Sequence, residues 1–121
     1  MMRTFPLIKL FILFLALSSC ELDRPVVSGF ESEFNSKSSG LVILHVGNHV
    51  QELSLEGRIE LTEGAIHVQL IGPDRDTVYQ NGFNQSGIYE IRENFPSREG
   101  NWKLQYQSHE GKGLIDLHMK Y

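Results

Sequence analysis

Apolar and polar residues alternate along most of the chain after Gly29. Over residues 52–61 every even position is polar, and all odd positions except Gly57 carry leucine or isoleucine. A period of two is typical of a β-strand with one buried face and one face in water. The same alternation recurs over residues 66–70, 102–107 and 115–121. The pattern therefore predicts strands after Gly29.

Two features depart from this alternation. The segment from Leu41 to Val46 is apolar on both faces, which indicates either a central strand or a strand whose outer face makes a second contact. Gly57 falls on the buried face of its segment, where glycine is typical of a bulge or a bend.

Turn-forming residues separate the apolar segments, and the intervals between them predict short strands joined by tight connections. We expect turns at Glu63-Gly64, Gly72-Pro73-Asp74, Asn81-Gly82 and Gly111-Lys112-Gly113. The predicted strands lie near residues 29–35, 40–46, 50–61, 64–71, 76–81, 87–93, 101–108 and 113–120. The fold class is therefore all-β: a single β-sandwich, Ig-like or jelly-roll, of about eight antiparallel strands after an N-terminal signal helix, with a barrel as second choice.

The first twenty residues have the pattern of a secretory signal. Arg3 and Lys9 make the N-terminus basic, residues 10–17 are wholly apolar, and the small residues Ser18 and Ser19 precede Cys20. The apolar run is shorter than the roughly 20 residues that a helix needs to cross a bilayer.

Leu17-Ser18-Ser19-Cys20 resembles the lipobox of bacterial lipoproteins, in which a leucine and two small residues precede the cysteine. The resemblance implies cleavage between Ser19 and Cys20, and acyl chains such as palmitate on Cys20. Because Cys20 is the only cysteine, an intramolecular disulfide and a cysteine-rich zinc site are excluded. Acyl chains at Cys20 would hold the processed chain at a membrane.

The predicted organisation is a signal peptide over residues 1–19, an acylated cysteine and tether over 20–28, and a β-sandwich domain over 29–121. Glu21 and Asp23 resemble the acidic export tag of surface lipoproteins in Bacteroidetes-type bacteria. This favours the outer membrane of the cell envelope and leaves open whether the domain faces the periplasm or the cell surface.

The charge of the processed chain argues against nucleic acid as a partner. Residues 20–121 keep nine of the eleven basic residues and all fifteen acids, a formal charge of −6. With no lysine or arginine cluster, neither nucleic acid nor an anionic bilayer is attracted to the domain surface. Membrane contact is expected through the N-terminal lipid.

The later half of the chain resembles small secreted bacterial sandwich domains, such as jelly-roll accessory modules of the pre-peptidase C-terminal type. The resemblance is carried by Glu63-Gly64, Gly72-Pro73-Asp74, Gly100-Asn101-Trp102-Lys103-Leu104 and the segment Gly111–Leu117. It implies a non-catalytic module.

The candidate metal and catalytic residues form no recognisable motif. Asp74 and Asp76 flank Arg75 and fall short of the six or more oxygens that calcium takes, and a turn between two strands explains them equally well. His45 and His49 are four residues apart, a spacing that would place both side chains on one face of a helix. They lie on a strand and its turn, so this argument for a zinc site fails. There is no Gly-x-Ser-x-Gly elbow and no phosphate-binding loop. We predict no catalytic residue, no metal and no cofactor.

Phe83 is an apolar residue in a polar turn, so we expect either an exposed contact or a lid over the core. Leu41 and Ile43 are the expected contacts on the two-sided segment. The predicted function is a lipid-anchored, non-catalytic envelope module that binds envelope proteins or a glycan or peptide ligand. The alternative is a structural or assembly subunit of an outer-membrane complex with residues 41–46 as the interface, and a hydrolase ranks third.

Overall fold

A computed structural model describes residues 26–121, which form six strands and no helix. The predicted signal peptide, Cys20 and the tether up to residue 25 lie outside the described residues. No helix in the described part is long and apolar enough to span a membrane. The strands are β1 (Val27–Phe34), β2 (Ser39–Val46), β3 (Glu52–Ile71), β4 (Thr77–Phe83), β5 (Gly87–Pro96) and β6 (Gly100–Lys120).

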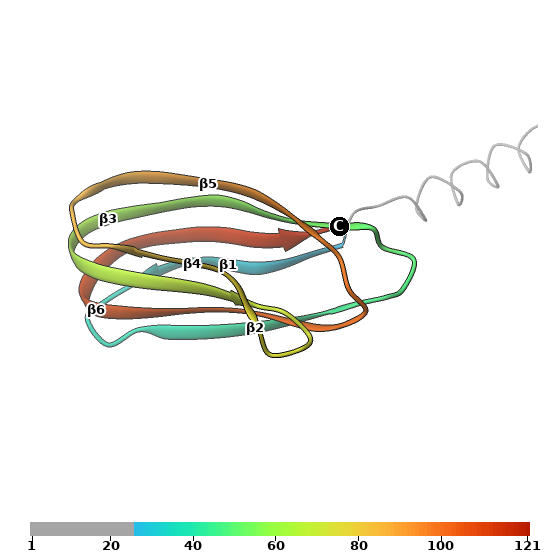
Figure 1. Cartoon of the computed structure of the whole chain (residues 1–121). Coiled ribbons are helices and arrows are strands. Elements are labelled where there is room, and N and C mark those ends of the chain that lie inside the picture. Colours follow the sequence, from blue (N-terminus) through green and yellow to red (C-terminus); the bar gives the residue numbers. More distant parts are fainter. Residues whose placement is uncertain (1–25) are drawn as a thin grey trace, which may run out of the picture.

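The two long strands, β3 and β6, pair antiparallel along their lengths and bend together, so that each contributes to two layers (Figure 1). Residues 52–61 of β3 and 113–120 of β6 lie between β5 and β1, in the order β1-β6-β3-β5. Residues 66–71 and 100–107 lie between β4 and β2, in the order β2-β6-β3-β4. These are the two four-stranded layers of a jelly roll.

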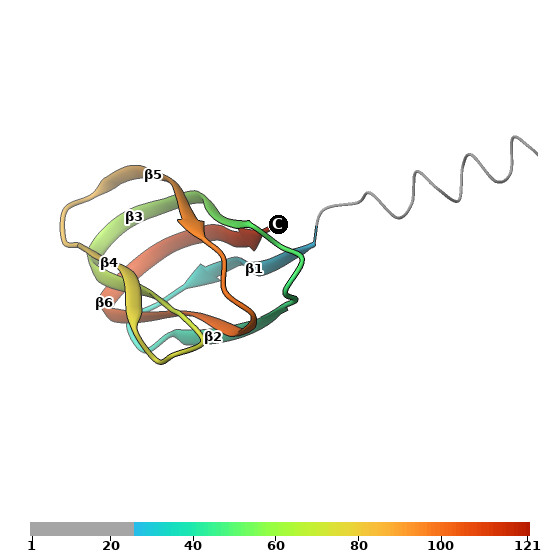
Figure 2. The same cartoon turned by 45° about the vertical axis from the view of Figure 1, so that its right-hand side comes forward.

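The eight predicted strands correspond to the four short strands and the two halves of each long strand, which confirms the β-sandwich. The turns expected at Glu63-Gly64, Asn81-Gly82 and Gly111-Lys112-Gly113 are wrong. The first and the last are bends within continuous strands (Figure 2), and Asn81-Gly82 lies within β4. Pairing between β3 and β6 shifts register between Leu61 and Glu63 and again at Ala65. Extra residues of this kind bend a strand without ending it.

Specific backbone conformations and hydrogen bonds hold the bends. Gly64 has φ 71°, and a Cβ there would collide with the carbonyl oxygen of Glu110, which itself has φ 54°. The buried hydroxyl of Ser108 donates to the carbonyl oxygen of Gly111 and accepts from its N–H, both at 3.0 Å. The bent ribbon thus keeps its polar groups bonded while its apolar face closes on itself.

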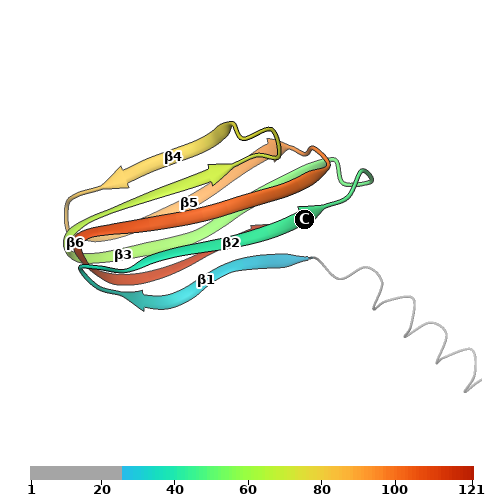
Figure 3. The same cartoon turned by 90° about the horizontal axis from the view of Figure 1, so that it is seen from below.

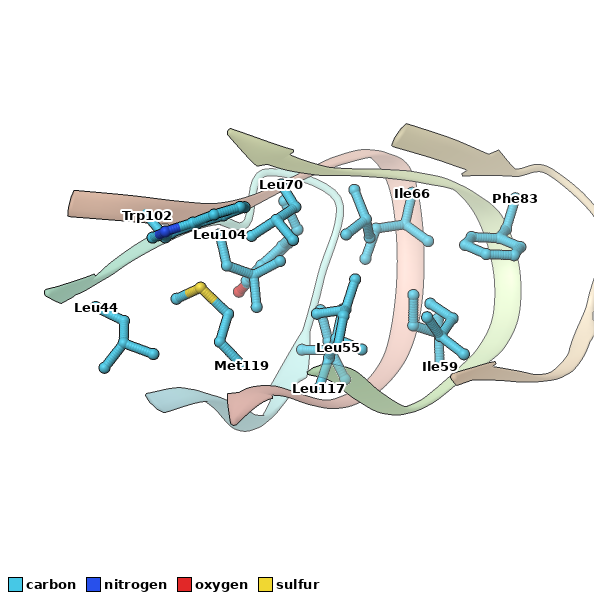
Figure 4. Packing of buried hydrophobic residues seen from close by; sticks show 14 of the residues in the cluster. Leu44, Leu55, Ile59, Ile66, Leu70, Phe83, Trp102, Leu104, Leu117 and Met119 are labelled. Atoms are coloured by element: carbon cyan, nitrogen blue, oxygen red, sulfur yellow. The ribbon is translucent and has the colours of Figure 1, made fainter. Parts of the chain in front are cut away.

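The core lies between the layers, where side chains from both point toward one another (Figure 4). Trp102 is fully buried, as the alternation of its segment predicts, and its Nε1 donates to the carbonyl oxygen of Arg98 at 3.0 Å. Other fully buried side chains come from both long strands: Leu53, Leu55, Ile59, Val68, Leu70, Leu104, Leu117 and Met119.

Two expectations about the strands need correction. β2 pairs with β6 alone within the described residues, so residues 41–46 form an edge strand and not a central one. Gly57 stays in register with Ile91 and Leu117, so there is no bulge at this position. Its φ of 151° and the close carbonyl oxygen of Asp116 nevertheless leave no room for a side chain.

Replacing Gly64 tests whether the fold depends on the bend. We expect Gly64→Ala to lower the free energy of unfolding by about 1–3 kcal/mol, because an L side chain there is strained and collides with the facing strand. Gly82→Ala is the matched control, since a Cβ at Gly82 meets only the side chain of His67 at an ordinary 3.6 Å. Urea denaturation should show a change within about 0.5 kcal/mol for the control. Equal stability of both variants would contradict this account of the bend.

Candidate functional site

The outer face of the β2-β6-β3-β4 layer carries side-chain amides from three neighbouring strands. The register places Gln105 of β6, Gln69 of β3 and Gln80 of β4 side by side. In the adjacent row Gln107 lies beside His67. These side chains alternate with buried core residues, so they point away from the core. We call these five residues the amide face.

A hydrogen-bonded row crosses the amide face. The Nε2 of Gln105 donates to the Oε1 of Gln69, and the Nε2 of Gln69 donates to the Oε1 of Gln80 at 3.4 Å. Each amide has two donor hydrogens and an oxygen with two lone pairs, so this row uses only part of its capacity. The orientation of the side chains is thereby fixed, while donors and acceptors remain for a ligand.

All residues of the amide face except Gln80 line a depression of about 460 Å³ at the β2 side of the layer. Its walls include Leu41, Ser39 and Gln107, together with Gln69 and Gln105. Among the described residues no Asp, Glu, Lys or Arg lines this depression; Lys103 lies one row further along β6. The surface combines neutral hydrogen-bonding groups with an aliphatic side chain.

The outer face of the β1-β6-β3-β5 layer is charged instead. Lys120 Nζ lies 2.9 Å from Glu56 Oε2, and Arg58 lies 3.4 Å from Glu60. The hydrogen bond and the charge of Lys120 hold the pKa of Glu56 below its ordinary value. A general acid needs a carboxyl group whose pKa is raised. Glu56 is therefore suited to ion pairing and not to proton donation at neutral pH.

Asp74 and Asp76 form a clamp with Arg98 between the β3–β4 and β5–β6 connections. Arg98 Nη1 lies 2.5 Å from Asp74, and Nη2 lies 2.8 and 3.0 Å from the two carboxylate oxygens of Asp76. This pairing lowers the pKa of Asp76. The Arg98 guanidinium also lies 5.5 Å from the ring centre of Trp102. The two carboxylates considered as calcium ligands thus bind the Arg98 guanidinium.

The histidines are dispersed. His45 Nδ1 lies 2.9 Å from Asn101 Oδ1, and the ring of His49 packs edge-on against Tyr121. Within residues 26–121 there is no group of three His, Cys, Asp or Glu side chains able to hold a metal.

The three predicted contact residues differ in their surroundings. Leu41 and Ile43 are 54% and 52% exposed on the outer face of β2. Phe83 lies at the end of β4, not in the turn, is only 9% exposed and packs on Tyr89 with ring centres 4.5 Å apart. The expected exposed contact at Phe83 is therefore wrong, and this residue covers one end of the core.

The sequence interpretation missed the amide face. The alternation places Gln69, Gln105 and Gln107 on the outward faces of their strands, but three separate segments, including that of Gln80, had to be aligned before the row could be recognised. The sequence does contain a signal. Glutamine or histidine occupies positions 67, 69, 80, 105 and 107, and each is next to an apolar residue in its strand.

Comparison with known proteins shows the fold and no family. No protein family model matches the chain, and no curated protein matches it. Latent PorU from Porphyromonas gingivalis is similar in structure with a TM-score of 0.54 and 8% identity, over 80% of this chain and 12% of that one. The CBM36-1 domain of a multidomain xylanase from the hindgut metagenome of Trinervitermes trinervoides has a TM-score of 0.50 and 10% identity, over 81% of this chain and 97% of that one.

The insecticidal delta-endotoxin Cry8Ea1 from Bacillus thuringiensis is also similar, with a TM-score of 0.50 and 16% identity. The match covers 77% of this chain and 19% of the endotoxin chain. This chain thus spans less than a fifth of the length of PorU and about a fifth of the endotoxin. It spans nearly the whole length of the CBM36-1 domain. These similarities show the fold alone, which is a β-sandwich.

Proposed function

We propose that this protein is a lipid-anchored, non-catalytic module of the cell envelope that binds a neutral glycan on its amide face. The observation that carries the ligand class is the hydrogen-bonded row of Gln105, Gln69 and Gln80 beside an uncharged depression. Similarity to the CBM36-1 domain supports only the point that a carbohydrate-binding module can have this fold.

The chemistry of the amide face matches a sugar. Sugar hydroxyl groups donate and accept hydrogen bonds without carrying charge, and amide groups do the same. The aliphatic Leu41 at the rim offers a contact for the C–H groups of a sugar ring. An anionic ligand would find few cations there, since Lys103 lies outside the depression.

The position of the termini supports a lipid anchor that leaves the amide face accessible. Val26 and Tyr121 exchange backbone hydrogen bonds of 2.9 and 3.1 Å at one end of the sandwich, away from the bends (Figure 1). A lipid on Cys20 would be separated from this end by five residues, which reach at most about 18 Å when extended. The amide face lies along the flank of the domain and not at its anchored end.

A second function, as an assembly subunit of an outer-membrane complex, is favoured by one observation. Leu41 and Ile43 expose about half of their surface on the same strand. Apolar residues grouped in this way are typical of protein contacts.

The lipid anchor is tested by metabolic labelling. Growth with an alkyne analogue of palmitate should label the wild-type protein, and the Cys20→Ala variant should carry no label because the acylated sulfur is absent. Ser36→Ala, outside the lipobox, is the control and should be labelled normally. Labelling of the Cys20→Ala variant would overturn the proposed site of acylation.

Glycan binding is tested by native affinity electrophoresis in gels that contain soluble xylan, β-glucan, mannan or glycogen. We expect at least one polysaccharide to retard the protein. Gln69→Ala combined with Gln105→Ala should weaken this retardation by roughly tenfold or more, because each lost amide removes about 1 kcal/mol of hydrogen bonding.

The matched control removes a neutral hydrogen-bonded pair from the opposite outer face. Ser54 Oγ donates to Asn94 Oδ1 at 2.8 Å, so Ser54→Ala combined with Asn94→Ala changes a similar number of polar atoms without changing the charge. The control should be retarded like the wild type. No retardation by any of the four polysaccharides, or equal weakening in both double variants, would count against the proposal.

A further inference from the structure

One edge of β2 is unpaired within residues 26–121, and two of the four outward side chains there, Leu41 and Ile43, are apolar. Figure 3 shows β2 along the margin of its layer, followed inward by β6, β3 and β4. The N–H of Ser108 donates to the carbonyl oxygen of Ser38 at 2.9 Å. Because antiparallel hydrogen bonds repeat every second residue, Gly40, Val42 and Leu44 bond to β6.

The alternate residues of β2 direct their backbone groups away from β6. These are Ser39, Leu41, Ile43 and His45, and the same four side chains lie on the outer face of the layer. Leu41 and Ile43 thus combine free backbone donors and acceptors with side chains that are half exposed. An edge strand of this kind is a template for another strand.

The other edges carry features that oppose pairing. Val26 and Tyr121 form a hydrogen-bonded pair, so the free edge of β1 presents the backbone of Glu31 and Glu33. β5 carries Glu90, Arg92 and Glu93, and β4 is interrupted by a register shift opposite Leu70 and Ile71. Charges and bulges of this kind protect sheet edges. β2 has no Asp, Glu, Lys or Arg, His45 being its one titratable side chain, and shows no register shift.

We propose that β2 pairs antiparallel with β2 of a second copy of this chain, with Val42 at the two-fold axis. In this register Leu41 of each copy faces Ile43 of the other, and Ser39 faces His45. Four residue pairs would each exchange two backbone bonds, about eight in all. The apolar side chains of both copies would meet in one cluster on the outer face.

In other registers of this pair of strands, the backbone hydrogen bonds or the apolar side chains are matched less well. A shift by one residue puts the free donors and acceptors out of phase. A shift by two residues pairs Leu41 with itself and leaves Ile43 opposite Ser39, or pairs Ile43 with itself and leaves Leu41 opposite His45. Only the register centred on Val42 places every large apolar side chain of the outer face opposite another.

The charge of the chain favours β2 as the edge used by a second copy. Two copies with a formal charge of −6 each over residues 20–121 repel one another when acidic edges meet, as at Glu31 and Glu33. β2 carries no acidic side chain and avoids this repulsion at the contact. One strand from each copy is a small interface, so we expect a weak dimer that forms at high concentration.

Cysteine cross-linking tests the register. Val42→Cys should form disulfide-linked dimers of the detergent-solubilised full-length protein under mild oxidation, because position 42 faces its symmetry mate in a close, non-hydrogen-bonded pair. Ser32→Cys is the matched control, since position 32 has the same place in the middle of the edge strand β1. It should cross-link no more than the wild type. Equal cross-linking at both positions, or none at position 42, would overturn the proposal.

Sedimentation equilibrium tests the association without a cross-link. The mass of the wild type should rise toward that of a dimer between about 10 and 500 µM, and Ile43→Lys should weaken the dimer at least tenfold by placing two cations together. Ile88→Lys, at an exposed position on the other layer, should behave like the wild type. A monomeric wild type, or equal dimerisation of both lysine variants, would contradict the proposal. Neither result depends on glycan binding, which is measured separately.

Discussion

The paired bends of β3 and β6 are the constraint on which the sandwich depends. The two strands remain hydrogen-bonded to one another on both sides of the bends, so each layer receives its central pair from the same ribbon. In one layer β1 and β5 flank this central pair, and in the other β2 and β4 flank it. This requires a left-handed backbone conformation at Gly64 and room for the backbone of Glu110. It also requires the hydrogen bond between the Ser108 hydroxyl and the backbone of Gly111. The core between Trp102 and Met119 can close only because the ribbon turns back on itself.

This arrangement gives the domain two outer faces with different chemistry. On the β1-β6-β3-β5 layer, acidic and basic side chains pair with one another, and Lys120 lowers the pKa of Glu56. On the β2-β6-β3-β4 layer, amides bond laterally and line an uncharged depression. On the first face, the charged side chains are paired with one another. The second face retains hydrogen-bonding capacity, which is why we assign the ligand to it and the second copy to its free edge.

The alternation of residues was sufficient to predict the strands, the sandwich and the burial of Trp102, because a period of two reports which face is in the core. It was not sufficient to distinguish a bend from a hairpin, since glycine at positive φ serves both, and Gly64 was therefore assigned to a turn. Phe83 was misplaced because β4 extends through Asn81-Gly82. The amide row depends on the register among three segments, and the Arg98 clamp on two distant connections. Neither is encoded in local spacing.

The most direct test of the central claim is an NMR titration of the ¹⁵N-labelled protein with short neutral oligosaccharides. The account predicts that the side-chain NH₂ signals of Gln69, Gln80 and Gln105 shift in a saturable way, together with backbone amides of β3 and β6 at the depression. The side-chain NH₂ signal of Asn94 on the opposite face should stay in place. Shifts confined to the connections at residues 47–51, 72–76 and 97–99, or to the charged layer, would contradict the assignment of the amide face.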